Sequence, residues 1–162
     1  MESIYAPWRS AYIRGKKPDG CIFCKNSLRE DDFVLREGKT AYVLMNCYPY
    51  SSGHLMVIPF RHLGQIHDLT AEEKVEIFDL VDLSLAVLTE TMKPDGFNLG
   101  MNLGNVAGAG VDDHLHTHIV PRWSGDHNFM TVTGATRVVS EDLMETRNKL
   151  LTCFERISLQ EG

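Results

Sequence analysis

The sequence predicts an α+β fold in which an antiparallel β-sheet of about five strands packs against one long central helix and a C-terminal helix. Three observations carry this prediction. Short strand-forming runs are separated by turn residues, as at Gly38-Lys39, which is typical of hairpins. Apolar residues recur at helical spacing over 70–92. A second helical pattern covers 140–157.

The first strands are predicted as neighbours in a hairpin. Segments 33–37 and 40–45 flank the two-residue turn. The polar stretch 46–53 is predicted as a loop, and segment 54–59 as a third strand that ends at Pro59. This succession of short strands favours antiparallel pairing.

The long helix is predicted over 70–92, where Thr70 and Glu73 form a capping box. Its apolar periodicity comes from Val75, Phe78, Val81, Leu85 and Leu88. The sequence Pro94-Asp95-Gly96 ends the helix, because proline and glycine break helical structure.

Two further strands and a helix complete the pattern. Segments 97–103 and 114–120 are predicted as strands, and the glycine-rich segment 104–110 between them as a loop. The C-terminal helix over 140–157 has Ser140 as its predicted N-cap and acidic residues in its first turn. Its core face is expected to consist of Leu143, Leu150, Leu151 and Phe154.

Length and composition predict a single domain over 1–162, because the 162 residues are 43% hydrophobic and 23% charged. We divide it into an N-terminal arm (1–19), a catalytic core (20–130) and the C-terminal helix. No apolar run approaches the roughly 20 residues of a membrane span. The N-terminus has a charge and a proline where a signal peptide needs an apolar core. We therefore expect a soluble, cytoplasmic protein with no membrane partner.

The charge balance limits the partners. A formal net charge of −6 disfavours non-specific binding to a nucleic-acid backbone. A local pocket for one phosphorylated ligand stays compatible with it, so we expect no nucleic-acid partner and a small anionic ligand.

A CxxC motif stands near the N-terminus, at Cys21 and Cys24, while Cys47 and Cys153 are isolated and are interpreted as small, half-buried residues. Without a signal peptide, a CxxC motif indicates a metal site or a redox pair. The redox interpretation requires Cys21 to begin a helix after a strand, and the sequence around it shows no such pattern.

Three histidines alternate along the last predicted strand, at His114, His116 and His118. Alternate residues of a strand share one face, so this face carries three imidazoles. They could hold a catalytic zinc, but alternate residues lie about 6.5 to 7 Å apart along a strand and rarely converge on one ion. The other interpretation is covalent catalysis at phosphorus, in which a neutral imidazole attacks a phosphate. Backbone amides of segment 104–110 and the Asn102 side chain could then hold the anion.

The segment HLHTHIV resembles the HxHxHxx signature of the histidine triad (HIT) superfamily of nucleotide hydrolases and transferases. Segments 53–59, 98–104 and 120–123 are also similar to the family, so the resemblance covers about 21–123. Ala6-Pro7-Trp8-Arg9 with Tyr12, and Gly125 to Met130, resemble the branch that includes diadenosine tetraphosphate (Ap4A) phosphorylases and related bacterial dinucleoside polyphosphate hydrolases.

The resemblance implies a HIT-like fold, a homodimer that joins two sheets, and nucleotidyl transfer from a purine dinucleoside polyphosphate by phosphorolysis or hydrolysis. It makes His116 the nucleophile that forms a nucleotidyl-histidine intermediate. His118 would hydrogen-bond the phosphate or the leaving group, and His54 would orient a neighbour. There are two alternatives: a phosphoramidate hydrolase, and a nucleotide-binding regulatory module with negligible turnover. We expect no organic cofactor.

The same resemblance assigns Asn46 to the ribose hydroxyls and Asn102 to the phosphate. Many family members carry a glutamine and then a hydroxyl residue where this chain has Gly110 and Val111. Backbone amides from Gly108 to Val111 are expected to replace those missing side chains.

The resemblance also gives the CxxC motif a role. Several family members bind a structural zinc through residues that correspond here to Cys21, Cys24, His62 and His114. This is a closed tetrahedral Cys2His2 set. It favours a structural zinc, which would fix the orientation of His114.

Overall fold

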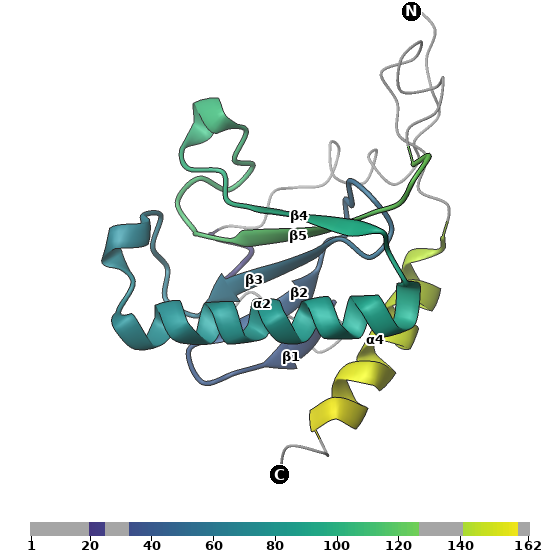
Figure 1. Ribbon diagram of the computed structural model, residues 1–162. Coiled ribbons are helices and arrows are strands. Elements are labelled where there is room, and N and C mark those ends of the chain that lie inside the picture. Colours follow the sequence, from purple (N-terminus) through teal and green to yellow (C-terminus); the bar gives the residue numbers. More distant parts are fainter. Residues whose placement is uncertain (1–19, 25–32, 127–140, 159–162) are drawn as a thin grey trace, which may run out of the picture.

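The computed structural model describes residues 20–24, 33–126 and 141–158, and it confirms the α+β fold (Figure 1). One antiparallel sheet has the strand order β1-β2-β3-β5-β4. Its strands are β1 (Val34–Glu37), β2 (Ala41–Met45), β3 (Leu55–Pro59), β4 (Gly96–Gly100) and β5 (Thr117–Arg122). The helices are α2 (Ala71–Met92) and α4 (Leu143–Ser158), with short 3-10 turns η2 (Ile66–Asp68) and η3 (Asn105–Ala107). No helix in these described ranges has the length and apolar character needed to cross a membrane.

The sheet buries both of its faces. Alternate residues of β2, such as Val43, pack with α2 and α4 in the larger apolar cluster. The residues between them, Tyr42 and Leu44, form a second cluster on the other face with Met56 and Phe23. Because neighbouring strand residues point to opposite faces, β2 and β3 contribute to both clusters. The helices cover one face, and the turn that contains Phe23 covers part of the other.

Helix α2 begins with the predicted capping box, since Thr70 accepts from the Glu73 backbone and Glu73 accepts from the Thr70 backbone. The predicted apolar periodicity is only partly the buried face. Val75 and Phe78 are 61% and 71% exposed. The buried positions are Glu73, Ile77, Leu80, Val81, Ser84, Val87 and Leu88. The helix has more apolar residues than one face can bury, and its contacts with the sheet select the stripe that includes Ile77.

The predicted histidine strand is shorter than expected. Strand β5 begins at Thr117, so His114 and His116 precede it. The preceding chain bends, and the Leu115 amide donates to the Leu63 carbonyl (2.7 Å) rather than to a strand neighbour. This bond holds the entry to β5 beside the segment that follows β3. Strand β4 ends at Gly100, three residues before the predicted end of 97–103.

Helix α4 begins at Leu143, and Asp142 occupies the capping position. Its Oδ1 accepts from the amides of Met144 (2.9 Å) and Glu145 (3.1 Å). The predicted cap, Ser140, lies outside the described residues, as do the arm (1–19) and segment 127–130.

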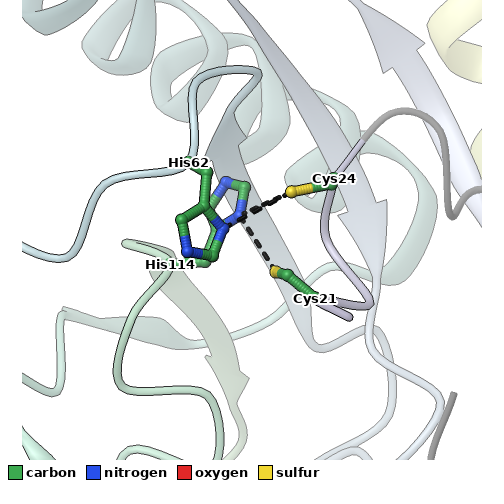
Figure 2. Close-up of side chains that lie close together, drawn as sticks. All are labelled: Cys21, Cys24, His62 and His114. Atoms are coloured by element: carbon green, nitrogen blue, oxygen red, sulfur yellow. Dashed lines mark hydrogen bonds between the residues drawn. The ribbon is translucent and has the colours of Figure 1, made fainter. Parts of the chain in front are cut away.

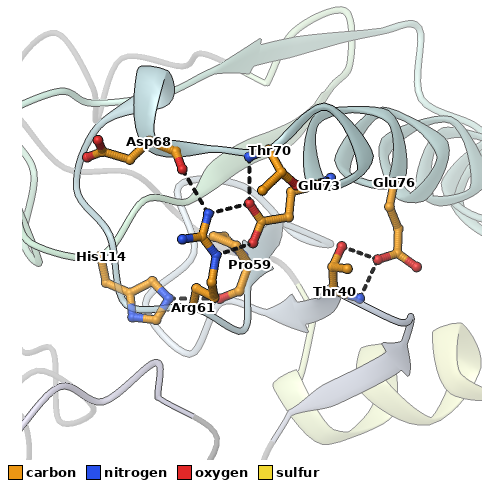
Figure 3. A network of polar contacts seen from close by, with 8 residues as sticks. All are labelled: Thr40, Pro59, Arg61, Asp68, Thr70, Glu73, Glu76 and His114. Carbon is orange, nitrogen blue, oxygen red and sulfur yellow. Dashed lines mark hydrogen bonds and ion pairs between the residues drawn. The ribbon is translucent and has the colours of Figure 1, made fainter.

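Two carboxylates of α2 tie the strand ends to the helix (Figure 3). Both oxygens of Glu73 accept from the Arg61 guanidinium at 2.6 Å, and Arg61 also donates to the Asp68 carbonyl. The hydrogen bond from Arg61 lowers the pKa of the Glu73 carboxyl to about 2. Glu76 accepts from the backbone and hydroxyl of Thr40 at the β1–β2 turn. The segment after β3, which carries His62, is therefore fastened to the start of α2.

Candidate functional site

A cavity of about 570 Å³ lies against the sheet face that the helices leave uncovered. Its lining includes seven residues that the sequence analysis assigned to catalysis or substrate: Asn46, Asn102, Gly108, Gly110, Val111, His116 and His118. They come from the β2–β3 loop, from the connection that follows β4 (102–111) and from the histidine segment. The structure thus brings together residues separated by up to 72 positions in the chain (118 − 46 = 72). His54 is fully buried behind His118 and does not line the cavity.

The rest of the cavity wall is mostly apolar and was missed in the sequence analysis, which searched for polar groups. It consists of Ile22, Phe23, Phe33, Leu44, Met45, Cys47, Tyr48, Tyr50 and Met56. For two of these residues, strand pairing indicates a place on the cavity wall. Leu44 and Met56 are cross-strand partners, and Met56 is also the partner of His118. Directly opposed residues of paired strands share a face. The flat face of an aromatic ring fits this wall better than a charged group.

Backbone contacts determine which nitrogen of His116 carries the proton. Its Nδ1 lies 2.8 Å from the His114 carbonyl oxygen. A carbonyl can only accept, so Nδ1 is the protonated nitrogen and Nε2 keeps its lone pair. In its neutral form, His116 therefore presents Nε2 as the nucleophilic nitrogen.

The same reasoning extends to His118 on the cavity wall and to His54 buried behind it. The Tyr50 amide donates to His54 Nδ1 (3.2 Å), so the proton of His54 sits on Nε2. That nitrogen donates to His118 Nδ1 (2.9 Å), which leaves the proton of His118 on Nε2. His118 Nε2 is buried and has no hydrogen-bond partner in the described part of the chain. A buried donor without a partner is costly, so this N–H is a ready donor for a ligand oxygen.

Burial keeps this pair neutral. Desolvation, together with the nearby His118 and His116, lowers the pKa of His54 to about 3. Desolvation and His116 lower the pKa of His118 to about 4. Both imidazoles are therefore uncharged at neutral pH, and His118 donates its hydrogen bond as a neutral group.

We expect the free energy of unfolding to fall as the pH drops from 7 to 5. A histidine whose folded-state pKa lies below its ordinary 6.5 binds protons more readily in the unfolded chain. The contribution of the neutral histidine to the free energy of unfolding is complete above pH 6.5 and is lost progressively as the pH falls towards 3. For His54 alone, the loss at pH 5 is about 2 kcal/mol. Urea unfolding from pH 5 to 8 measures this slope. His54→Asn should flatten it, and an equal slope in both proteins would contradict this origin.

A second group of side chains lies beside the cavity (Figure 2). Ligand atoms of Cys21, Cys24, His62 and His114 all lie within 4.8 Å of one another. Nδ1 of His114 is 3.2 Å from Cys21 Sγ and 3.9 Å from Cys24 Sγ, and Cys24 Sγ is 3.4 Å from His62 Nδ1. Tetrahedral zinc with its usual bond lengths separates sulfur and nitrogen ligands by roughly 3.5 Å. The four side chains therefore fit one tetrahedral ion.

We call these four side chains the metal cluster: Cys21, Cys24, His62 and His114. The Nε2 atoms of its two histidines, which point away from the cysteines, both have partners. His114 Nε2 donates to the Pro59 carbonyl (2.8 Å), and His62 Nε2 lies 3.4 Å from the Asp113 carboxylate. Because a carbonyl can only accept, the contact with Pro59 places the proton of His114 on Nε2 and leaves its Nδ1 lone pair directed at the cysteines. Metal-binding histidines commonly have such a partner. The contact with Pro59 is visible in Figure 3.

Comparison with known proteins agrees with the fold and with the motif. The HIT domain model matches residues 27–125. The AP-4-A phosphorylase of Mycobacterium tuberculosis (strain H37Rv) is 42% identical over 127 residues, 78% of this chain and 65% of that protein. The chain thus spans just under two thirds of the length of this relative. An adenosine 5'-monophosphoramidase of Schizosaccharomyces pombe is 35% identical over 104 residues, 63% of this chain and 74% of that protein.

A solved structure supports the same fold. The crystal structure of a Zn-bound histidine triad family protein from Mycobacterium smegmatis has a TM-score of 0.69 and 22% identity, and the match covers 86% of this chain and 96% of that one. With the matched family model and the five-stranded sheet, these findings show that the chain belongs to the HIT family.

Proposed function

We propose that the protein transfers a nucleotidyl group from a purine dinucleoside polyphosphate of the Ap4A type, through a nucleotidyl-histidine intermediate, with inorganic phosphate as the acceptor. The observation that carries this proposal is the pair of imidazoles on the cavity wall. The Nδ1–H of His116 leaves the Nε2 lone pair of the neutral ring available, and the buried Nε2–H of His118 has no hydrogen-bond partner among the described residues. The similarity to an AP-4-A phosphorylase favours phosphate over water as acceptor.

In the proposed first step, the Nε2 lone pair of His116 attacks the α-phosphorus. The Nε2–P bond forms, and the P–O bond to the leaving nucleoside polyphosphate breaks with its electron pair on the departing oxygen. The ring becomes a cation, and its Nδ1–H bond to the His114 carbonyl becomes a charge-assisted bond. The Nε2–H of His118 donates to a phosphoryl oxygen, where negative charge accumulates.

The second step restores the enzyme. An oxygen of inorganic phosphate attacks the same phosphorus, the Nε2–P bond breaks, and the lone pair returns to His116. Starting from Ap4A, the products are ATP from the first step and ADP from the second. Asn102 and the backbone from Gly108 to Val111 line this end of the cavity and are proposed to hold the phosphates. Gly110 offers no side chain there, and the space admits the attacking phosphate.

We further propose that the metal cluster binds a structural zinc. Four protein ligands close the coordination sphere, and such sites stabilise the fold without an open position for substrate. The ion would hold the CxxC turn against His114, and the chemistry at phosphorus would need nothing from it. The Zn-bound relative with the same fold is consistent with this assignment.

A homodimer that joins two sheets is also proposed. Strand β4 pairs with β5, and in the described sheet no strand lies on its other side. Leu99 on this edge is 50% exposed, and Val75 and Phe78 of α2 are more exposed still. An edge strand that exposes an apolar side chain is a surface that a second chain can cover.

Incubation with Ap4A, with and without inorganic phosphate, tests the reaction. We expect ADP and ATP that form only when phosphate is present, measured by chromatography of the products. AMP and ATP without phosphate would make the protein a hydrolase instead. Release of AMP from adenosine 5'-phosphoramidate, with Ap4A untouched, would favour the phosphoramidase alternative. AMP binding without any turnover would favour a regulatory binding module.

A further inference from the structure

We propose that the metal cluster and the nucleotide cavity are coupled, because the turn that binds the metal also forms a cavity wall and holds the nucleophile. Occupancy of the cluster would then set the affinity of the cavity for a nucleotide. This inference rests on the proposed nucleotide site and on metal binding. It assigns Phe23 as a positioning residue for His116.

The turn from Cys21 to Cys24 has two sides. The sulfur atoms of its first and last residues belong to the metal cluster, and the two residues between them, Ile22 and Phe23, line the cavity. The Cys24 amide donates to the Cys21 carbonyl (3.3 Å), which closes the turn. Because the cavity-lining residues are bonded directly to the two cysteines, a movement of either sulfur atom also moves the cavity wall.

Phe23 connects the turn to the nucleophile. Its ring is 6% exposed, and its centroid lies 5.1 Å from the ring of His116 and 5.9 Å from the ring of His114. At these separations the rings are in contact, so Phe23 limits the rotation of His116. The Phe23 carbonyl accepts from the Tyr42 hydroxyl (2.7 Å), which anchors the turn to the sheet.

A second connection runs through the backbone. His114 offers its Nδ1 to the cluster, while its own carbonyl accepts the Nδ1–H of His116. The ring of His114 is held by the Pro59 carbonyl and by the cluster. The ligand that faces the metal is thus the residue that orients the nucleophile.

Without an ion, the two cysteine sulfur atoms would be joined to the histidine rings only by weak S–H···N contacts. The S···N distances are 3.2 to 3.9 Å, and a thiol is a poor hydrogen-bond donor. Four metal–ligand bonds would replace these contacts with a rigid junction. Removal of the metal would leave the Tyr42 hydrogen bond and the apolar packing of Phe23 to hold the turn, and it would therefore loosen the contact between Phe23 and His116.

The experiment compares AMP binding in zinc-loaded, chelated and zinc-restored protein by calorimetry. We expect roughly tenfold weaker binding after chelation, the size of a lost aromatic contact, and recovery when zinc returns. Long-range proton–nitrogen NMR on histidine-labelled protein reports the ring tautomers. His116 should show a single Nδ1–H form when loaded, and a mixture of forms when the metal is absent.

A variant separates this coupling from simple unfolding. Phe23→Leu in the zinc-loaded protein keeps all four ligands, so its zinc content should not change, while AMP binding weakens and the His116 tautomers mix. If circular dichroism shows that chelation unfolds the chain, the Phe23→Leu variant alone tests the coupling. Unchanged AMP affinity and unchanged His116 signals in Phe23→Leu overturn the coupling, and so does a protein that takes up no zinc. If loaded parent protein fails to bind AMP, the proposed function fails instead.

Discussion

Replacing His116 with alanine abolishes turnover and leaves nucleotide binding nearly intact. We expect His116→Ala to lower the rate of nucleotide release from Ap4A by roughly 10⁴-fold or more, because the proposed covalent intermediate forms on the Nε2 that this change removes. The cavity loses one side chain of its lining and keeps its apolar wall. Chromatography measures the rate, and calorimetry with AMP measures the binding. Mass spectrometry of quenched reactions should detect a nucleotidyl adduct on the parent protein and none on the variant.

Two other histidines serve as comparisons. His67 lies on η2 with its side chain 80% exposed, so His67→Ala should leave the rate within about twofold. His118→Ala removes one hydrogen bond to the phosphate, which is expected to cost roughly 10² to 10³ in rate while the adduct still forms. If His116→Ala keeps more than a tenth of the parent activity, the nucleophile is elsewhere and the mechanism is wrong.

Local patterns predicted local structure well. The capping box at Thr70 and the hairpin turn after β1 were confirmed, because each depends on residues a few positions apart. Which helical face is buried depends on contacts with the sheet, and the apolar periodicity alone placed Phe78 in the wrong environment. The segment before β5 that carries His114 leaves the strand and brings this ring to the cysteines, a constraint that strand periodicity does not contain.

The candidate site divides in the same way. Alternation predicts one face for all three histidines, but only His116 and His118 line the cavity, while His114 faces the cysteines. The tautomers of the buried imidazoles depend on backbone groups such as the Tyr50 amide and the Pro59 carbonyl. Those contacts join distant segments and have no local sequence signal. The metal set spans 93 residues from Cys21 to His114, and it came from the family resemblance rather than from spacing.

Zinc is expected at one ion per chain, and its removal should strongly destabilise the fold. An ion that binds the folded chain at a free concentration of about 1,000 times its Kd stabilises it by about 4 kcal/mol. Cys24→Ser removes one of four ligands, so we expect the ion and this stabilisation to be lost together. Elemental analysis measures the ion, and urea unfolding of loaded, chelated and variant protein measures the free energy.

Two matched variants identify which residues hold the ion. Cys47→Ser changes a cysteine that lines the nucleotide cavity and should keep full zinc content. His116→Ala should also keep the zinc, because its Nδ1 is engaged by the His114 carbonyl. Zinc lost from His116→Ala but kept in Cys24→Ser would move the metal to the alternating histidines and restore a catalytic zinc. In the structure His114 directs Nδ1 to the cysteines, away from such a shared ion, and this orientation is why we expect the opposite result.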